Sequence, residues 1–293
     1  MTIKCVISNN QGGLSNRMKS LISAIRYSVH HNIDYYVNWP ILNSYSTHNH
    51  ILNCRFESLF KNNIIINIDN NDNDNLSSVT YNSHCFLILD KDNIPTNFNN
   101  FKSKCPVSFS KNDSLNRNID FMYNEIPTNL LEEYKNYFKI LQPIDNIQSK
   151  IDTYSNSNFN DNTISVHIRS WSRNGENSRR NALFNIKMYE NKLISCIENA
   201  DDLSNLKFFL ASDSSDVIDY FTNKSTIKEY IITYPRKTKL DISRDIPEGV
   251  QEDLIELYLL GKNKKIIGSH FSTYTEVAWY LAGCPKDITI ISP

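Results

Sequence analysis

Long apolar runs, a strong excess of one charge and closely spaced cysteines are all missing from this sequence. No apolar run approaches the roughly 20 residues that a membrane-spanning helix needs, so we expect no integral membrane segment. The formal net charge of -1 gives no overall field toward an anionic membrane or nucleic acid, and we expect no nucleic-acid partner. The six cysteines form no C-x-x-C pair, and residues 1–8 resemble a strand rather than a secretion signal, which favours reduced thiols and a cytoplasmic location.

The size and composition of the chain favour two globular domains. Its 293 residues are long for one compact core, and a hydrophobic content of 40% can fill ordinary interiors. We expect an N-terminal α/β domain over residues 1–150 and a C-terminal Rossmann-like domain over 160–293. The polar stretch at 156–162 is the expected linker.

The first domain opens with an α/β pattern. An apolar strand over 3–8 precedes a glycine turn, a helical stripe runs over 14–29, and a second strand covers 34–39. Residues 61–125 hold only short apolar runs between Asn/Asp/Ser loops, and a helix is expected over 130–141. The pattern therefore predicts the start of this domain better than its middle.

The second domain alternates strand and helix throughout. The expected strands cover 163–169, 206–211, 229–234, 265–268 and 287–291, and the expected helices cover 186–197, 215–221, 253–260 and 273–282. Repeated strand–helix units predict a parallel, doubly wound sheet, whose ligands bind outside the carboxyl ends of the strands.

A glycine turn, Gly12-Gly-Leu-Ser-Asn-Arg17, joins the first strand to the first helix. Gly12 and Gly13 let the backbone turn sharply, and the helix N-terminus offers N–H groups to an anion or a sugar hydroxyl, with Asn16 and Arg17 in the first turn. An ordinary strand–helix turn is the alternative. The stretch is neither a Rossmann G-x-G-x-x-G fingerprint nor a P-loop, because Met18 stands where the second P-loop glycine is required.

A histidine and an arginine end the first strand of the second domain. His167 and Arg169 lie two apart on a strand and should share a face, and an arginine fork suits a diphosphate. Glu176, in the arginine-rich loop that follows, is placed as a general base might be. A structural histidine and a solvated loop are the alternatives.

Polar residues also end two later strands. Asp213 follows the strand at 206–211 and could bind ribose hydroxyls or a base edge. Ser269, Ser272 and Thr273 lie where a strand gives way to the last helix, and can form a phosphate cradle. Helix capping is the alternative in both places, with Thr273 and Glu276 spaced as a capping box.

Asp72 and Asp74 have the D-x-D spacing of metal-dependent glycosyltransferases, in which two carboxylates hold a divalent ion. They lie inside an Asn/Asp repeat that follows no defined strand. We therefore expect no metal site.

Taken in order, these motifs resemble the fucosyltransferase superfamily, which includes nodulation α-1,6-, α-1,2- and protein O-fucosyltransferases. The resemblance covers residues 5–60 and 163–283, through G-G-L-S-N-R, W-P…N-C-R-F-E-S-L-F, H-I-R, A-S-D and G-S-H-F-S-T-Y-T-E-V-A. It implies a GT-B architecture of two Rossmann-like domains facing a cleft, with GDP-fucose as donor, no metal or other cofactor, and inversion at the anomeric carbon.

The resemblance also implies roles for the motif residues. Arg169 would hold the β-phosphate with support from His167, Asp213 would contact the nucleoside, and Asn16 would face the sugar or acceptor. The remaining donor-binding positions are Gly12, Gly13, Arg17, Ser269, Ser272 and Thr273. Many relatives read H-x-R-R-x-D where this chain has Ser170 and Ser172, which leaves the linkage and the general base open.

The sequence therefore predicts an inverting, metal-independent transfer of fucose from GDP-fucose to a glycan hydroxyl. Arg169, Glu176 and Asn16 are the expected catalytic residues, with the first domain on the acceptor side and the second on the donor side. Two alternatives remain: a transferase that uses another nucleotide sugar, and a catalytically silent protein that binds a nucleotide sugar.

Overall fold

The computed structural model describes residues 5–9, 12–31, 34–39, 41, 51–61, 66–67, 86–89, 128–172 and 177–292. The chain divides into two compact units, Met1–Ile144 and Asp145–Pro293. The second unit begins with helix α4 (Asp145–Asn158), which packs against a helix of that same unit. The polar stretch expected to be a linker is therefore partly helical, because Ile147 and Ile151 give α4 a buried face among its polar residues.

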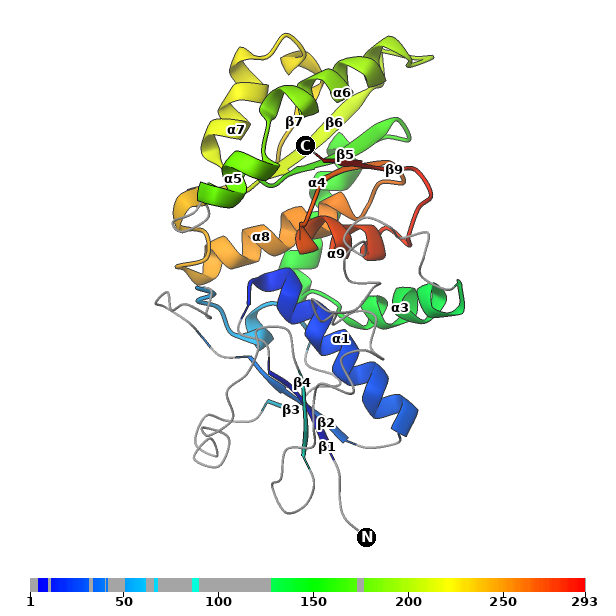
Figure 1. Cartoon of the computed structure of the whole chain (residues 1–293), viewed down its shortest axis with the longest axis vertical. Coiled ribbons are helices and arrows are strands. Elements are labelled where there is room, and N and C mark those ends of the chain that lie inside the picture. Colours follow the sequence, from blue (N-terminus) through cyan, green and yellow to red (C-terminus); the bar gives the residue numbers. More distant parts are fainter. Residues whose placement is uncertain are drawn as a thin grey trace. The chain divides into compact units, whose positions relative to one another are not determined.

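The first unit is built on a mixed sheet. Strand β1 (Cys5–Asn9), helix α1 (Leu14–His31) and strand β2 (Asp34–Asn38) follow the predicted order, and β2 lies parallel to β1. Strand β3 (Ile66–Asn67) pairs parallel with β2, while β4 (Phe86–Leu89) pairs antiparallel with β1. The described sheet has the order β3-β2-β1-β4. Figure 1 labels these strands below helix α1. The antiparallel edge strand is a finding that the sequence pattern did not predict.

Helix α1 packs on β1 through the predicted apolar stripe. The buried members of that stripe are Leu14, Met18, Leu21, Ile22 and Ile25. Val29, which continues the same spacing, is exposed, so the buried stripe is shorter than predicted. Helix α3 (Thr128–Ile140) confirms the helix predicted near the end of this unit and also packs against α1.

The second unit contains the predicted parallel sheet. Its strands are β5 (Thr163–Ile168), β6 (Lys207–Ser212), β7 (Ile231–Ile232), β8 (Ile266–Ser269) and β9 (Ile288–Ile291). They pair in the order β7-β6-β5-β8-β9, and every pair is parallel. The chain winds outward from β5 in one direction and then from β8 in the other, so the strand order reverses between these two neighbours.

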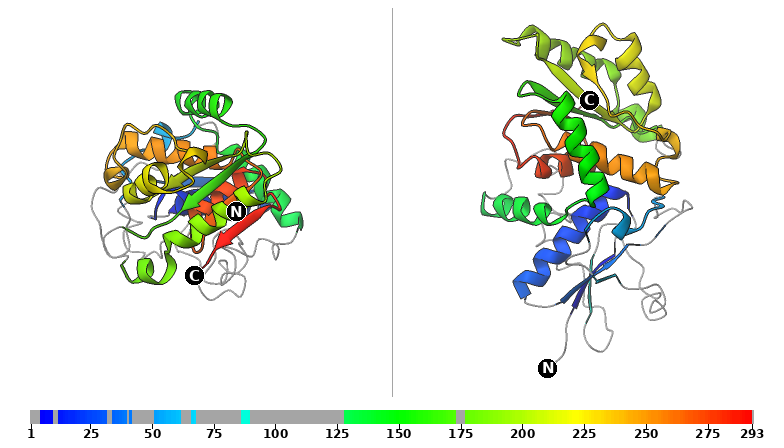
Figure 2. Two further views of the ribbon diagram at one scale, coloured as in Figure 1. Left: turned by 90° about the horizontal axis from the view of Figure 1, so that it is seen from above. Right: turned by 180° about the vertical axis from the view of Figure 1, so that it is seen from behind.

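Helices cover both faces of this sheet. Ile164, Val166 and Ile168 pack with α6 (Ile186–Glu198) and α7 (Ser215–Asp219) on one face. The opposite face, which Ser165 and His167 share, is covered by α8 (Pro247–Leu260) and α9 (Thr273–Leu281). Figures 1 and 2 show these two helical layers with the strands between them. The alternation follows from the two-residue period of a strand.

Three predicted elements have different limits. Helix α8 begins at Pro247 rather than at 253, because proline suits the first helical position. Helix α7 passes after Asp219 into a π-turn over Tyr220–Lys224. Strand β7 is shorter than the predicted 229–234, because Lys228–Tyr230 form a 3-10 turn. None of the described helices is long and apolar enough to cross a membrane.

The ends of α9 show how its capping differs from the prediction. Ser272 is the N-cap and accepts a hydrogen bond from Thr275 N–H at 3.4 Å, so the N-cap lies one residue before the predicted Thr273, which is the first residue of the helix. Gly283 has φ +80° and its N–H donates to Tyr280 O at 3.0 Å. The N–H of the next residue donates to Trp279 O at 2.9 Å, which completes a Schellman motif.

Replacing Gly268 with alanine should destabilise the second unit. A Cβ at this buried position of β8 would lie 2.1 Å from Thr275 Cγ2, and a clash of this kind costs about 1–3 kcal/mol. Gly283→Ala is the control, since a Cβ there meets no atom within 4 Å and the positive φ alone costs roughly 1 kcal/mol. Urea unfolding of both variants measures the difference, and a G268A protein as stable as wild type would contradict the close approach.

Candidate functional site

Polar residues gather where β5, β6 and β8 end. Arg169 and Ser170 follow β5, Asp213 follows β6, and Ser269 ends β8. In the parallel register Ile168 lies opposite Ser212, so the next residues, Arg169 and Asp213, leave the sheet side by side. This edge lies beside the reversal of strand order, which is where ligands bind in open α/β sheets.

A mostly buried ion pair joins two of these loops. Arg169 Nη1 donates to Asp213 Oδ2 at 2.6 Å, and the side chains are 12% and 9% exposed. Ser170 N–H donates to the other carboxylate oxygen at 2.7 Å. Burial raises the pKa of Asp213, but the charge of Arg169 and the Ser170 N–H outweigh it and hold the pKa below its usual value. Asp213 is therefore a carboxylate whose two oxygens orient its neighbours.

Ser269 links three segments through one hydroxyl. Its Oγ accepts from Arg169 N–H at 2.7 Å and donates to His167 O at 3.1 Å. Tyr189 OH lies 2.6 Å from the same oxygen. Because Ser269 is 1% exposed and its hydroxyl is used in these contacts, it fixes the position of β5 against β8.

His167 is an internal, neutral histidine. Its Nδ1 lies 2.7 Å from Thr275 Oγ1, and its ring packs on Tyr274 with the centroids 4.8 Å apart. Thr275 Oγ1 accepts from Ser269 N–H at 3.2 Å, which leaves the hydroxyl proton for Nδ1. Burial lowers the pKa of His167 to about 3. Strand β5 ends at Ile168, so Arg169 follows the strand, where its guanidinium pairs with Asp213. The charges of both groups act on His167, and the expectation that His167 and Arg169 share a face stays a prediction.

The loops after β5 and β8 both hold an aromatic residue in the left-handed region. Trp171 has φ 54° and Phe271 has φ 55°, conformations that bulky residues adopt only under strain. Within the described residues, Ser170 Oγ and Trp171 Nε1 are buried without a hydrogen-bond partner. Strain and buried unpaired polar atoms at one place are features of a binding site rather than of an inert turn.

The N-terminus of α9 lies at the same edge of the sheet. Ser272 is 4% exposed and its side chain caps the helix, while Thr273 is partly exposed. Capping, the alternative interpretation of this motif, therefore accounts for the Ser272 hydroxyl. The backbone N–H groups of the first turn of α9 still lie just after the end of β8, where a helix N-terminus can bind an anion.

In the first unit the glycine turn encloses Arg17. This side chain is 1% exposed, its Nε donates to Gly12 O at 2.8 Å, and its backbone N–H donates to Gly13 O at 3.1 Å. Its guanidinium lies 5.2 Å from the centre of the Trp39 ring, and burial lowers its pKa to about 9. Arg17 thus fixes the turn, whereas Asn16 is only half-buried.

The W-P…N-C-R-F-E-S-L-F residues form an aromatic layer beside Arg17. Trp39 Nε1 donates to Cys54 O at 3.2 Å, and the Trp39 ring lies 5.3 Å from Phe56 and 6.3 Å from Phe60. Packing of these rings explains the spacing of the motif.

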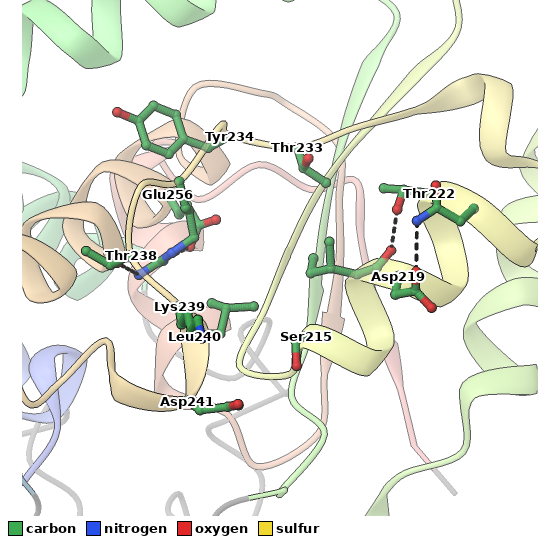
Figure 3. A pocket seen from close by; sticks show the side chains of 13 residues that line it. Ser215, Asp219, Thr222, Thr233, Tyr234, Thr238, Lys239, Leu240, Asp241 and Glu256 are labelled. Atoms are coloured by element: carbon green, nitrogen blue, oxygen red, sulfur yellow. Dashed lines mark hydrogen bonds and ion pairs between the residues drawn. The ribbon is translucent and has the colours of Figure 1, made fainter.

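A cavity of about 460 Å³ lies at the carboxyl ends of β6 and β7. Figure 3 shows Ser215 and Asp219 on one side of it and Thr238 and Glu256 on the other. The lining residues are Ser215, Ile218, Asp219, Thr222, Asn223, Thr233, Tyr234, Arg236, Thr238, Lys239, Leu240, Asp241 and Glu256. The volume suits a small organic ligand, and no motif in the sequence predicted this cavity.

Arg236 anchors one wall of the cavity among acidic residues of α8. Its Nη1 lies 2.5 Å from Glu256 and its Nη2 lies 2.9 Å from Asp253, while Glu252 accepts from the N–H groups of Lys237 and Thr238. Burial raises the pKa of Glu256 to about 7, although the charge of Arg236 acts in the opposite direction. Glu252, Asp253 and Glu256 lie close together on one helix, and this group of carboxylates is the sequence signal that could have pointed to the cluster.

No protein-family model matches the chain, and no curated protein matches it in sequence. Solved structures match it in fold. Fucosyltransferase NodZ from Bradyrhizobium shares 18% identity with a TM-score of 0.52, over 93% of this chain and 90% of that one. POFUT1 in complex with GDP-fucose shares 12% identity with a TM-score of 0.51, over 97% and 96% of the chains. A mutant of Arabidopsis thaliana FUT1 in complex with GDP shares 13% identity with a TM-score of 0.52, over 98% and 70%.

The chain has the fold of these fucosyltransferases. The fucosyltransferase fold agrees with the resemblance drawn from the sequence motifs, and the match covers most of the chain. Glu176, Asp72 and Asp74 lie outside the described residues. Among the residues that are described, no three His, Cys, Asp or Glu side chains are grouped to hold a metal ion.

Replacing His167 with glutamine should reduce the loss of stability in acid. Because its folded pKa of about 3 lies below the usual 6.5, the stability from neutral His167 is complete above about pH 6.5 and is lost as the pH falls toward 3. One extra proton taken up on unfolding gives a slope of about 1.4 kcal/mol per pH unit, which the variant should lack. Urea unfolding between about pH 6 and pH 4 measures this slope. His270→Gln is the control, since His270 is only partly buried, and equal slopes in H167Q and wild type would refute the assignment.

Proposed function

We propose that this protein transfers fucose from GDP-fucose to a glycan hydroxyl, with inversion and without a metal ion. The carrying observation is the oriented Arg169–Asp213 pair at the reversal of strand order, in a chain with the fucosyltransferase fold. The similar structures include POFUT1 with GDP-fucose and FUT1 with GDP. In this proposal the two units are the Rossmann-like halves of a GT-B enzyme, the second unit binding the donor and the first the acceptor.

Arg169 and the start of α9 are the proposed diphosphate site. Asp213 orients Arg169 at the end of β5, which supports a guanidinium set in advance toward a ligand at that edge. Backbone N–H groups at the α9 N-terminus, after Ser272, favour an anion there. Each well-placed donor of this kind is worth about 3–4 kcal/mol when charge develops on the leaving group.

The cavity beside β7 is the proposed nucleoside site. Asp213, given that role from the sequence, uses both carboxylate oxygens within the protein. The cavity instead offers hydroxyls at Thr233 and Thr238 and a carboxylate at Asp241, groups that can accept hydrogen bonds from the N–H edge of guanine or from ribose hydroxyls. It lies along the same carboxyl edge of the sheet as Arg169, as a nucleoside joined to the diphosphate requires.

The proposed reaction is a direct displacement. The acceptor oxygen attacks the anomeric carbon while the bond from that carbon to the β-phosphate oxygen breaks, and the acceptor proton passes to a base, for which Glu176 is our candidate. Negative charge grows on the β-phosphate, where Arg169 stabilises it. Asn16 is the candidate from the first unit for contact with the sugar or the acceptor.

Binding should be selective for guanosine and independent of metal. Calorimetric titration with GDP, GDP-fucose and UDP in the presence of EDTA should give binding of both guanosine ligands and little or none of UDP. Equal or stronger UDP binding would favour a transferase with another donor. GDP-fucose binding without turnover on any acceptor pool would favour a silent binding protein, and binding rescued only by manganese would direct attention to Asp72 and Asp74.

Arg169→Ala should lower turnover by at least about a hundredfold, because the leaving phosphate loses the oriented guanidinium donor at the end of β5. The same change leaves Asp213 buried without its partner, at a cost of about 3–5 kcal/mol in stability. The double variant R169A/D213A separates the two effects: it should regain much of the stability in urea unfolding while turnover stays low. Near-normal transfer by either folded variant would refute the role of Arg169.

A further inference from the structure

Two guanidinium groups pack against one tryptophan ring beside the proposed diphosphate site. Arg169 Cζ lies 4.8 Å from the centre of the Trp171 ring, and Arg179 Cζ lies 5.5 Å from it. Both distances are within the range of a cation–π contact. The ring itself is fixed, because Trp171 is 6% exposed and is held at φ 54°.

As far as the structure describes the chain, only one of the two arginines has its charge balanced by a carboxylate. Arg169 is paired with Asp213 at 2.6 Å, so that pair brings little net charge to the edge of the sheet. Arg179 belongs to helix α5 (Asn177–Leu183) and is exposed, and no carboxylate forms an ion pair with it in the described part of the chain. Trp171 therefore holds, next to the end of β5, a second positive charge that Asp213 does not neutralise.

A nucleotide diphosphate needs more cation than the Arg169–Asp213 pair supplies. The diphosphate of a nucleotide sugar carries two negative charges and gains a third as the sugar leaves. A second guanidinium can form charge-assisted hydrogen bonds to the outer phosphate, and stacking on an aromatic face keeps such a long side chain near its target.

We propose that Arg179, stacked on Trp171, is a second binding residue for the outer phosphate of the nucleotide donor. This inference rests on the proposed function, since it concerns the diphosphate of the same donor. It also gives a reason for the strained loop after β5, because that loop holds a Trp171 ring that contacts both the arginine that follows the strand and the arginine of the next helix.

The neighbouring Arg180 offers a matched control. It has the same charge and lies on the same short helix, but its guanidinium packs 5.7 Å from the Phe184 ring instead of on Trp171. Successive residues of a helix point about 100° apart, so the two side chains leave α5 in different directions. A general effect of positive charge would affect both variants, whereas a phosphate contact should affect only R179A.

The experiment compares wild type, R179A, R179K and R180A by calorimetric titration with GDP and with GMP, in EDTA. R179A should bind GDP about 10- to 100-fold more weakly and GMP within about twofold of wild type, because only GDP carries the outer phosphate. R179K should recover part of the loss, since lysine keeps the charge but not the fork. R180A should match wild type for both ligands, and urea unfolding checks that every variant is folded.

The possible failures are distinguishable. If R179A binds GDP as tightly as R180A does, or loses GDP and GMP affinity equally, the assignment of Arg179 is wrong while the proposed function stands. If wild type binds neither GDP nor GDP-fucose, the proposed function is wrong and the inference is refuted with it.

Discussion

The ion pair between Arg169 and Asp213 is the interaction on which the polar edge of the second unit depends. It joins the ends of β5 and β6, and through Ser170 N–H it also fixes the start of the loop that carries Trp171. Both charges are largely removed from water, so each is tolerated only because the other is present. A guanidinium held in this way is already oriented when a ligand arrives, and electrostatic stabilisation of a transition state requires such preorganisation.

A network of uncharged, hydrogen-bonded side chains lies next to this pair. Ser269 contacts Arg169 N–H, Tyr189 and His167 O, and Thr275 joins His167 to the backbone of β8. Burial keeps His167 uncharged near neutral pH, so no second positive charge opposes Arg169 from inside the sheet. This buried hydrogen-bond network holds the ends of β5 and β8 in place, which is how the loops that follow them can keep Trp171 and Phe271 in strained conformations.

The second polar centre of this unit surrounds Arg236, and it has a different character. Three acidic residues of α8 are arranged around that arginine and its loop, and one of them, Glu256, lines the 460 Å³ cavity together with Arg236. The Arg169 edge and the cavity share the carboxyl side of one parallel sheet, which suits an extended ligand with an anionic part and a polar ring system. This arrangement, together with the fucosyltransferase fold, is why we favour a nucleotide sugar over a simple anion.

The sequence by itself determined the elements and the edge of the sheet where polar residues gather. The strands β5, β6, β8 and β9, and the helices α1 and α6, follow from apolar periodicity, which is a local property of the chain. The tertiary structure alone decided which polar groups are partners. Arg169 and Asp213 are distant in sequence and meet through strand register, and Arg236 meets α8 through the folding of a loop. The Ser272 cap is a local bond to Thr275 N–H, which the sequence had already offered as the alternative interpretation. Arg17, by contrast, became an internal residue packed against Trp39, because contacts between separate elements are made only in the folded chain and periodicity carries no information about them.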